Sequence, residues 1–191
     1  MVVWTLLLYT LAGFCLKSGD DLLDEMHRYR LSCVPLSASG LFLGLVSTSS
    51  EYDLALVSSI LVGVTISGKV DRPQFLVGFM TLGLTLLLYG LPPLPTPVYW
   101  WGLLVLLLVV LMAADERLHE HAASVPNRLL SVVFRYRFVA KIGVLLPVFI
   151  IPPILPTALG LWCFDTGYEL FHLLTRFTHQ VEGVSSYNTR P

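Results

Sequence analysis

The stretch Pro73–Ala114, PQFLVGFMTLGLTLLLYGLPPLPTPVYWWGLLVLLLVVLMAA, has no charged residue in 42 consecutive positions. About one residue in four is charged in a typical soluble domain, so such a run does not fit a water-exposed fold. About 20 apolar residues cross the hydrocarbon core of a bilayer, and the stretch is therefore long enough for two crossings. The prolines at 91–97 then mark the turn between them. The sequence predicts an all-α, polytopic transmembrane helix bundle.

The rest of the chain supports this prediction, because only 13% of its 191 residues are charged and 55% are hydrophobic. Residues 1–16 lack the basic start of a secretory signal, so we interpret them as a retained span. We expect one transmembrane domain at 1–177, with a cytoplasmic loop at 115–137, and a flexible cytoplasmic tail at 178–191. Proline, glycine and charge divide the chain into about seven spans, with six to eight as the range: 2–16, 34–48, 54–68, 73–90, 97–114, 138–152 and 154–175.

The basic residues orient these spans. With seven spans, the connections at 49–53, 91–97 and 152–156 contain no Lys or Arg, and all twelve basic residues lie on the other side. By the positive-inside rule the N-terminus is outside and the C-terminus cytoplasmic, as in a multi-pass protein of the cell membrane. Residues 128–138, RLLSVVFRYRF, have the pattern of an amphipathic helix at the membrane surface. The net charge of −1 gives no support to a nucleic-acid partner, so the expected partners are membrane lipids.

Acidic residues are segregated as well, although the positive-inside rule does not govern them. Glu51 and Asp53 belong to a predicted outer loop, and the other eleven of the thirteen lie on the inner side. Apart from Glu182 in the tail, the inner acids follow or sit within different spans. We therefore expect them to converge on one pocket that faces the cytoplasm. The groups are Asp20/Asp21/Asp24/Glu25, Asp71, Asp115/Glu116/Glu120 and Asp165/Glu169.

The last predicted span carries the candidate catalytic residues, Asp165 and Glu169. With His172 they fall at i, i+4 and i+7, and so share one helical face. At about 1.5 Å per residue, Asp165 lies about 16 Å into its span. A carboxylate near mid-bilayer costs at least about 2.5 kcal/mol and is a functional hypothesis by default. The structural alternatives are a buried hydrogen-bonding aspartate, or a shifted span in which both acids meet water.

A divalent metal, most simply Mg²⁺, is the expected cofactor. Carboxylates crowded at one depth need cations to offset their repulsion, and aspartates spaced as in DDLLD can hold Mg²⁺, which in turn holds a diphosphate. The alternatives are solvated helix ends for the acidic motifs and a topogenic charge pair for SGKVDR. The predicted metal ligands are Asp20, Asp21, Asp24, Asp115 and Glu116. The predicted substrate-binding residues are Lys17, Lys69, Asp71 and Arg128, and His119 is a further candidate site residue.

DDLLD and DTGYE resemble the paired aspartate-rich motifs that intramembrane prenyltransferases turn to the cytoplasm. The resemblance covers only these stretches, because the chain lacks that family's Asn-Asp opening and is short for its number of spans. It implies an enzyme that acts on a lipid (di)phosphate such as a polyprenyl diphosphate. The predicted function is a metal-dependent transferase or phosphatase in which the metal stabilises the leaving group.

Other functions stay open at this point. A cation transporter or channel would use Asp165 and Glu169, although the outer halves of the spans offer mainly hydroxyls such as Ser58 and Ser59. A structural or assembly subunit would carry its acids on the outside of the bundle. A di-iron or zinc site would use the three acid-x-x-His pairs at 24–27, 116–119 and 169–172. The FDTG string at 164–167 matches aspartic proteases, but it falls in a predicted transmembrane helix.

Overall fold

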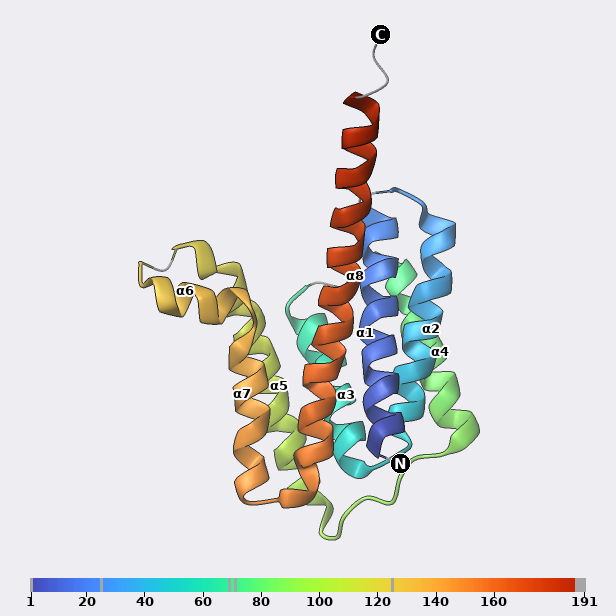
Figure 1. Cartoon of the computed structure of the whole chain (residues 1–191). Helices are drawn as coiled ribbons and strands as arrows, with labels where there is room; N and C mark the ends of the chain where they lie inside the picture. The colour runs from blue at the N-terminus through green and yellow to red at the C-terminus, as the bar shows by residue number, and fades with distance from the viewer. Residues whose placement is uncertain (1, 25, 69, 71, 125, 188–191) are drawn as a thin grey trace.

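The protein's structure is a computed structural model that describes residues 2–24, 26–68, 70, 72–124 and 126–187, without the side chains of 123, 135 and 176–187. Within these residues every regular element is helical (Figure 1). The predicted all-α fold is confirmed. The helices are α1 (Val2–Asp24), α2 (Tyr29–Ser47), α3 (Glu51–Ile66), α4 (Gln74–Tyr89), α5 (Val98–Glu120), α6 (Arg128–Arg135), α7 (Phe138–Leu145) and α8 (Leu155–Tyr187), with 3-10 turns η1 (Ala122–Ser124), η2 (Leu146–Phe149) and η3 (Pro152–Ile154).

Three of the helices, α1, α2 and α5, are long and apolar enough to cross a membrane. Two shorter apolar helices are α4 and the segment Phe138–Phe149, which joins α7 to η2. Large apolar side chains such as Leu87, Phe149 and Ile150 are 83%, 86% and 85% exposed, as expected for side chains that face lipid. The structure therefore supports a membrane protein, whereas the seven-span count and the orientation stay predictions.

Six of the seven predicted spans each fall largely on one α-helix, whereas 138–152 is divided between α7 and the 3-10 turns η2 and η3. Several helices also extend past the apolar residues. α1 continues from the predicted end at residue 16 to Asp24, so that KSGDDLLD is helical. α5 likewise continues through DERLHE to Glu120. The predicted tail starts at residue 178, inside the last part of α8. The acidic motifs of α1 and α5 are therefore presented on regular helices rather than on loops.

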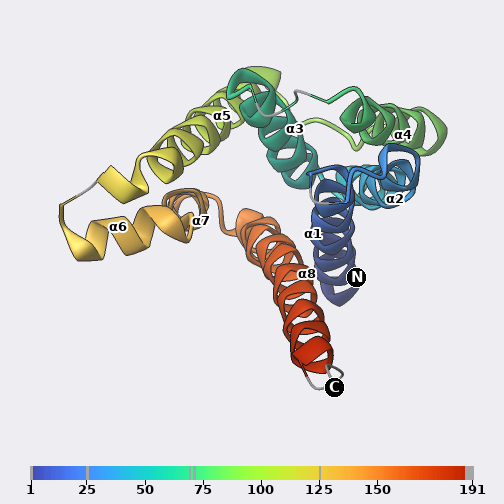
Figure 2. The same ribbon diagram turned by 90° about the horizontal axis from the view of Figure 1, so that it is seen from above.

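Apart from α6, which lies crosswise, the α-helices run alternately up and down (Figure 1). α1 packs between α2 and α8, α4 packs on α2, and α5 packs on both α3 and α7. Viewed along the helices, α1, α2 and α4 lie on one side and α5, α6 and α7 on the other, with α3 and α8 between them (Figure 2). The last turns of α1, α3 and α5 and the first turns of α2, α4 and α7 share one end of the bundle, which we call the inner end.

Glycines set the closest helix crossings. A Cβ atom on Gly167 of α8 would lie 2.0 Å from the Thr10 carbonyl oxygen, and one on Gly13 of α1 would lie 1.9 Å from that of Phe164. Gly40 meets Gly78 in the same way where α2 crosses α4. Small residues let membrane helices approach this closely. The α1–α8 crossing fixes the rotation of α8 and thereby the positions of its polar side chains.

Asp53 corrects one sequence-based expectation. It was predicted to lie in an outer loop, but it belongs to the first turn of α3 and is only 5% exposed. Ser50 caps the helix, accepting the Asp53 backbone N–H at 3.1 Å and donating its hydroxyl to Asp53 Oδ2 at 2.7 Å. Tyr9 and Thr157 donate their hydroxyls to Oδ1 at 2.9 and 2.8 Å. Asp53 thus joins α1, α3 and α8 near the outer end.

Candidate functional site

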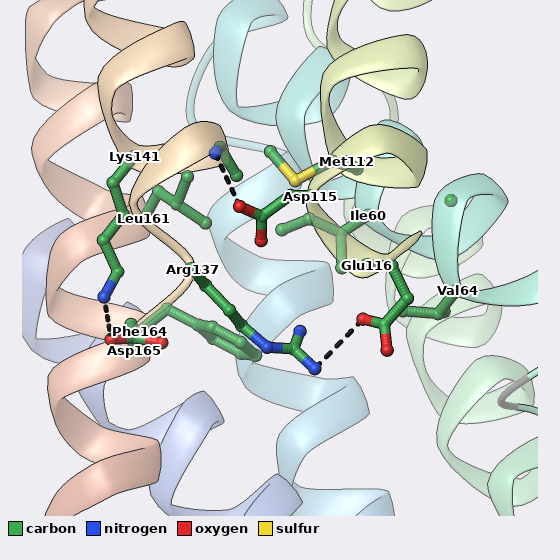
Figure 3. A pocket seen from close by; sticks show the side chains of 12 residues that line it. Ile60, Val64, Met112, Asp115, Glu116, Arg137, Lys141, Leu161, Phe164 and Asp165 are labelled. Carbon is green, nitrogen blue, oxygen red and sulfur yellow. Dashed lines mark hydrogen bonds and ion pairs between the residues drawn. The ribbon is translucent and has the colours of Figure 1, made fainter. Parts of the chain in front are cut away.

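A small pocket of about 80 Å³ lies toward the inner end, between α3, α5, α7 and α8. Its polar wall consists of three acids and two cations, Asp115, Glu116, Asp165, Arg137 and Lys141 (Figure 3). Apolar side chains from α3 and α8 close the other sides. This is room for a few water molecules or for one small charged group. The rest of a lipid would have to lie outside it.

Lys141 and Asp165 form the most enclosed ion pair of the pocket. Lys141 lies in the first turn of α7 and is 9% exposed. Its Nζ lies 2.5 Å from Asp165 Oδ2 and donates to the Tyr136 carbonyl oxygen at 2.9 Å. The ammonium group also lies 5.2 Å from the centroid of the Phe138 ring, within cation–π range. The predicted catalytic acid is therefore paired with a cation that was not among the predicted site residues.

Arg137 pairs with Glu116 and has an unusual backbone. Its φ and ψ of 53° and 39° are left-handed, which costs about 1–2 kcal/mol for a residue other than glycine. Its guanidinium Nη2 lies 3.0 Å from Oε2 of Glu116, which is 4% exposed. A strained backbone that carries a side chain into a pocket is a hint of function.

Asp115 holds the start of α7. Its Oδ1 accepts the Ala140 backbone N–H at 3.0 Å, one of the amides that the first turn of a helix leaves without an intrahelical acceptor. Asp115 is 4% exposed and comes from α5. It therefore fixes α7 relative to α5, and with it the positions of Arg137 and Lys141.

A second group of charges lies at the inner part of the α1–α8 contact. Lys17 Nζ is 2.8 Å from Asp21 Oδ1 and 3.3 Å from Asp20 Oδ2. The Tyr168 hydroxyl donates to Asp20 Oδ2 at 3.3 Å, and Lys17 Nζ lies 5.1 Å from the Tyr168 ring centroid. Asp21 is 4% exposed, and its Oδ2 accepts no hydrogen bond from any described residue. The Asp21 carboxylate can therefore accept a further hydrogen bond through Oδ2.

Tyr168 connects the two groups. It lies three residues after Asp165 on α8, so one helix contributes side chains to both groups. We call the connected set the inner belt: Lys17, Asp20, Asp21, Asp115, Glu116, Arg137, Lys141, Asp165 and Tyr168. Of the acids that the sequence predicts to converge, Asp115, Glu116 and Asp165 line the pocket, whereas Asp20 and Asp21 lie in the second group. Convergence of all the inner acids on one pocket therefore stays a prediction.

The predicted metal site has no preformed ligand cluster in the part of the chain that the structure describes. No three His, Cys, Asp or Glu side chains come together there in a way that would hold an ion. Asp24 is exposed and lies 3.6 Å from Arg72, apart from the belt. Lys69 and Asp71 lie outside the described residues, so their predicted roles are untested. Magnesium binding therefore stays a prediction.

The other predicted site residues are dispersed. Glu169 is exposed on α8, His172 is half-buried, and Arg128 is the exposed first residue of α6. His119 Nδ1 lies 3.2 Å from the Phe134 carbonyl oxygen and so connects α5 with α6. Their predicted roles stay predictions.

Arg137 and Lys141 are the residues that the sequence analysis missed. In the sequence RYRFVAK they look like basic residues that flank a membrane span and serve only to set its orientation. The available signal was their spacing of four, which places both on one side of the start of α7. Comparison with protein-family models, with curated proteins and with solved structures found no match to this chain, so its function is inferred from the site alone.

Proposed function

We propose that the protein is a multi-pass protein of the cell membrane, with about seven spans and an outside N-terminus, that binds and acts on the phosphate end of a membrane lipid. The described basic side chains support this orientation, since they lie on the inner part of the bundle, which the positive-inside rule assigns to the cytoplasm. They are Lys17, Arg28, Arg30, Arg72, Arg117, Arg128, Arg137 and Lys141.

The pairing of Arg137 and Lys141 with carboxylates in the four-helix pocket is the observation that carries the proposal. Arginine presents a planar fork that fits two phosphate oxygens, and lysine adds a point charge. A carboxylate oxygen occupies, in each resting ion pair, the position that a phosphate oxygen would take. Phosphate binding therefore exchanges one anionic partner for another, and no cation has to be desolvated anew.

A divalent metal fits this exchange without a preformed cluster. Mg²⁺ is usually bound through one or two carboxylates together with substrate phosphates. When Lys141 turns to the phosphate, Asp165 gains free oxygens beside it. We propose that Asp165 would then help to hold Mg²⁺ bound to a lipid diphosphate, and that Arg137 and Lys141 would neutralise negative charge on the phosphate oxygens; the metal would supply further charge stabilisation there.

The test is direct binding of a polyprenyl diphosphate to the full chain in lipid nanodiscs, with and without Mg²⁺. Arg137→Lys and Lys141→Arg keep the charge but change the donor geometry. Loss of a charge-assisted hydrogen bond costs about 1.5–3 kcal/mol, so each variant should bind at least about tenfold more weakly. Arg117→Lys is the matched control, since Arg117 is exposed in the last turn of α5, at the same end and outside the pocket lining. Equal affinity for all three variants would refute the proposal.

Cation transport is the second candidate, and buried Asp53 is the observation that favours it, because it adds an ionisable side chain in the outer half of the bundle. Against it, three hydroxyl groups already donate to the Asp53 oxygens. Cation flux into proteoliposomes that Asp165→Asn abolishes would favour transport over lipid chemistry. The structural-subunit alternative gains no support, since Asp21, Asp115 and Glu116 are buried.

A further inference from the structure

We propose that α6 is a surface helix that docks on the anionic lipid headgroups of the inner leaflet and so holds the turn from which Arg137 enters the pocket. This inference concerns a different surface from the pocket and does not depend on which ligand the pocket binds. The partner of α6 is the same bilayer that α5 and α7 are proposed to enter.

The position of α6 is the first reason. It lies across the inner end of α5 and α7 rather than along them (Figure 1). It also lies at the edge of the molecule away from α1, α2 and α4 (Figure 2). α5 is apolar enough to span a membrane, and the Phe138–Phe149 segment is apolar as well. A helix that lies across their shared end therefore lies at the height of the headgroups.

The two faces of α6 fit such a surface. Helical spacing places Arg128 and Ser131 on one side, with Val132 and the backbone position of residue 135, and Leu129, Leu130, Val133 and Phe134 on the other. Leu129 and Leu130 are 72% and 42% exposed. A short helix with leucines on one face and basic or polar side chains on the other binds at the boundary between headgroups and acyl chains.

The charges nearby favour anionic lipids. Arg117 of α5 and Arg128 of α6 are exposed, and the Arg137 side chain is 43% exposed. Glu116, in contrast, is buried and paired with Arg137. Basic side chains next to a membrane helix attract anionic headgroups. Glu120, the last residue of α5, is exposed as well. The three arginines still outnumber it, so this corner of the inner end presents mainly positive charge to the membrane surface.

Hydrogen bonds connect α6 to η1, and the chain after α6 leads directly into the pocket. Asn127 Oδ1 accepts the Leu129 backbone N–H at 3.0 Å, and Ser131 donates its hydroxyl to the Ala122 carbonyl oxygen at 2.8 Å. Tyr136 is the residue that directly follows α6, and its carbonyl oxygen accepts a hydrogen bond from Lys141 Nζ. A shift of α6 would therefore move both the acceptor of Lys141 and the strained backbone of Arg137. Docking on lipid restrains that movement.

Spin labels on the full chain test the proposal without any pocket ligand. Cys15, Cys33 and Cys163 are first changed to serine, and a label is then placed by Leu129→Cys or, as the matched control, by Arg128→Cys. The protein is reconstituted in vesicles of phosphatidylcholine, alone or mixed with phosphatidylglycerol. Accessibility to oxygen, which partitions into lipid, is compared with accessibility to a water-soluble nickel chelate.

We expect the oxygen-to-nickel accessibility ratio to be several-fold higher at 129 than at 128 in the anionic vesicles, and this difference to shrink in the neutral ones. Equal ratios at the two positions would overturn the docking of α6. An undiminished difference in neutral vesicles would overturn the role assigned to anionic headgroups. Failure of the pocket to bind a lipid diphosphate would leave both readouts unchanged, so the two proposals fail separately.

Discussion

Replacing Gly167 with alanine should separate α1 from α8 and weaken both stability and the inner belt. The new Cβ would lie 2.0 Å from the Thr10 carbonyl oxygen, whereas Cβ atoms essentially never come closer than 3.0 Å to a heavy atom of another, non-bonded part of the protein. The two backbones must therefore move apart by about 1 Å or more at this point. Overpacking of this kind costs about 1–3 kcal/mol, and we expect the upper part of that range because a backbone atom cannot rotate away.

The same movement should reach the belt. Tyr168 is the next residue, and its hydroxyl donates to Asp20 Oδ2 over 3.3 Å. A separation of about 1 Å takes these atoms beyond hydrogen-bond range. Gly167→Ala should therefore also weaken whatever ligand binding depends on Asp20 and Lys17, even though residue 167 itself touches no ligand.

Unfolding in mixed detergent micelles, followed by circular dichroism as the fraction of dodecyl sulfate is raised, measures the effect. Gly102→Ala is the control, because a Cβ on Gly102 of α5 meets no atom within 4 Å. Alanine gains up to about 1 kcal/mol of helix propensity over glycine in both variants. That gain cancels in their difference, which isolates the clash. If the two variants are equally stable, the close α1–α8 crossing does not exist as described.

Three further predictions concern the buried polar groups. Asp53→Ala should lower the free energy of unfolding by about 1–3 kcal/mol, since it leaves buried hydroxyls without an acceptor, whereas Asp53→Asn, which keeps one carboxamide oxygen, should cost less in the same unfolding assay. In a double-mutant cycle, Glu116→Gln and Arg137→Gln should show a coupling energy of about 0.5–3 kcal/mol; additive losses would mean that the ion pair contributes nothing. Lys17→Met should lower the free energy of unfolding by about 3 kcal/mol, because it leaves the buried Asp21 carboxylate without its cation. Arg72→Met should lower it by at most about 1 kcal/mol, because the ion pair of Arg72 with Asp24 is exposed.

The fold class followed from the sequence because a helix that crosses a bilayer needs about 20 consecutive, mainly apolar residues. Pro73–Ala114 cannot be mistaken for a soluble segment. The ends of the helices were less predictable, since backbone hydrogen bonds continue through polar residues as readily as through apolar ones. KSGDDLLD remains helical in α1 for this reason, although it follows the last apolar position.

The candidate acids are visible in the sequence, as is Lys17, which pairs with Asp20 and Asp21, but the partners of Glu116 and Asp165 are not. Lys141 and Asp165 are 24 positions apart, and their contact depends on the rotation of α7 against α8. Helices that are apolar nearly all round carry little information about that rotation. For Asp53, the Ser50-x-x-Asp53 pattern was a visible capping signal, but the hydroxyls of Tyr9 and Thr157 reach it only in the folded bundle.

The charge balance of the inner belt bears on its ligand. In its pocket three carboxylates, those of Asp115, Glu116 and Asp165, face two cations, those of Arg137 and Lys141, so three minus two leaves one negative charge if all are ionised. A bare phosphate would add to this excess and be repelled, because charges in a low-dielectric site are weakly screened. A phosphate that arrives with a divalent cation brings the compensating charge with it. The belt should therefore select the magnesium complex of a lipid diphosphate over the free anion, which makes the Mg²⁺ dependence of binding the most informative part of that experiment.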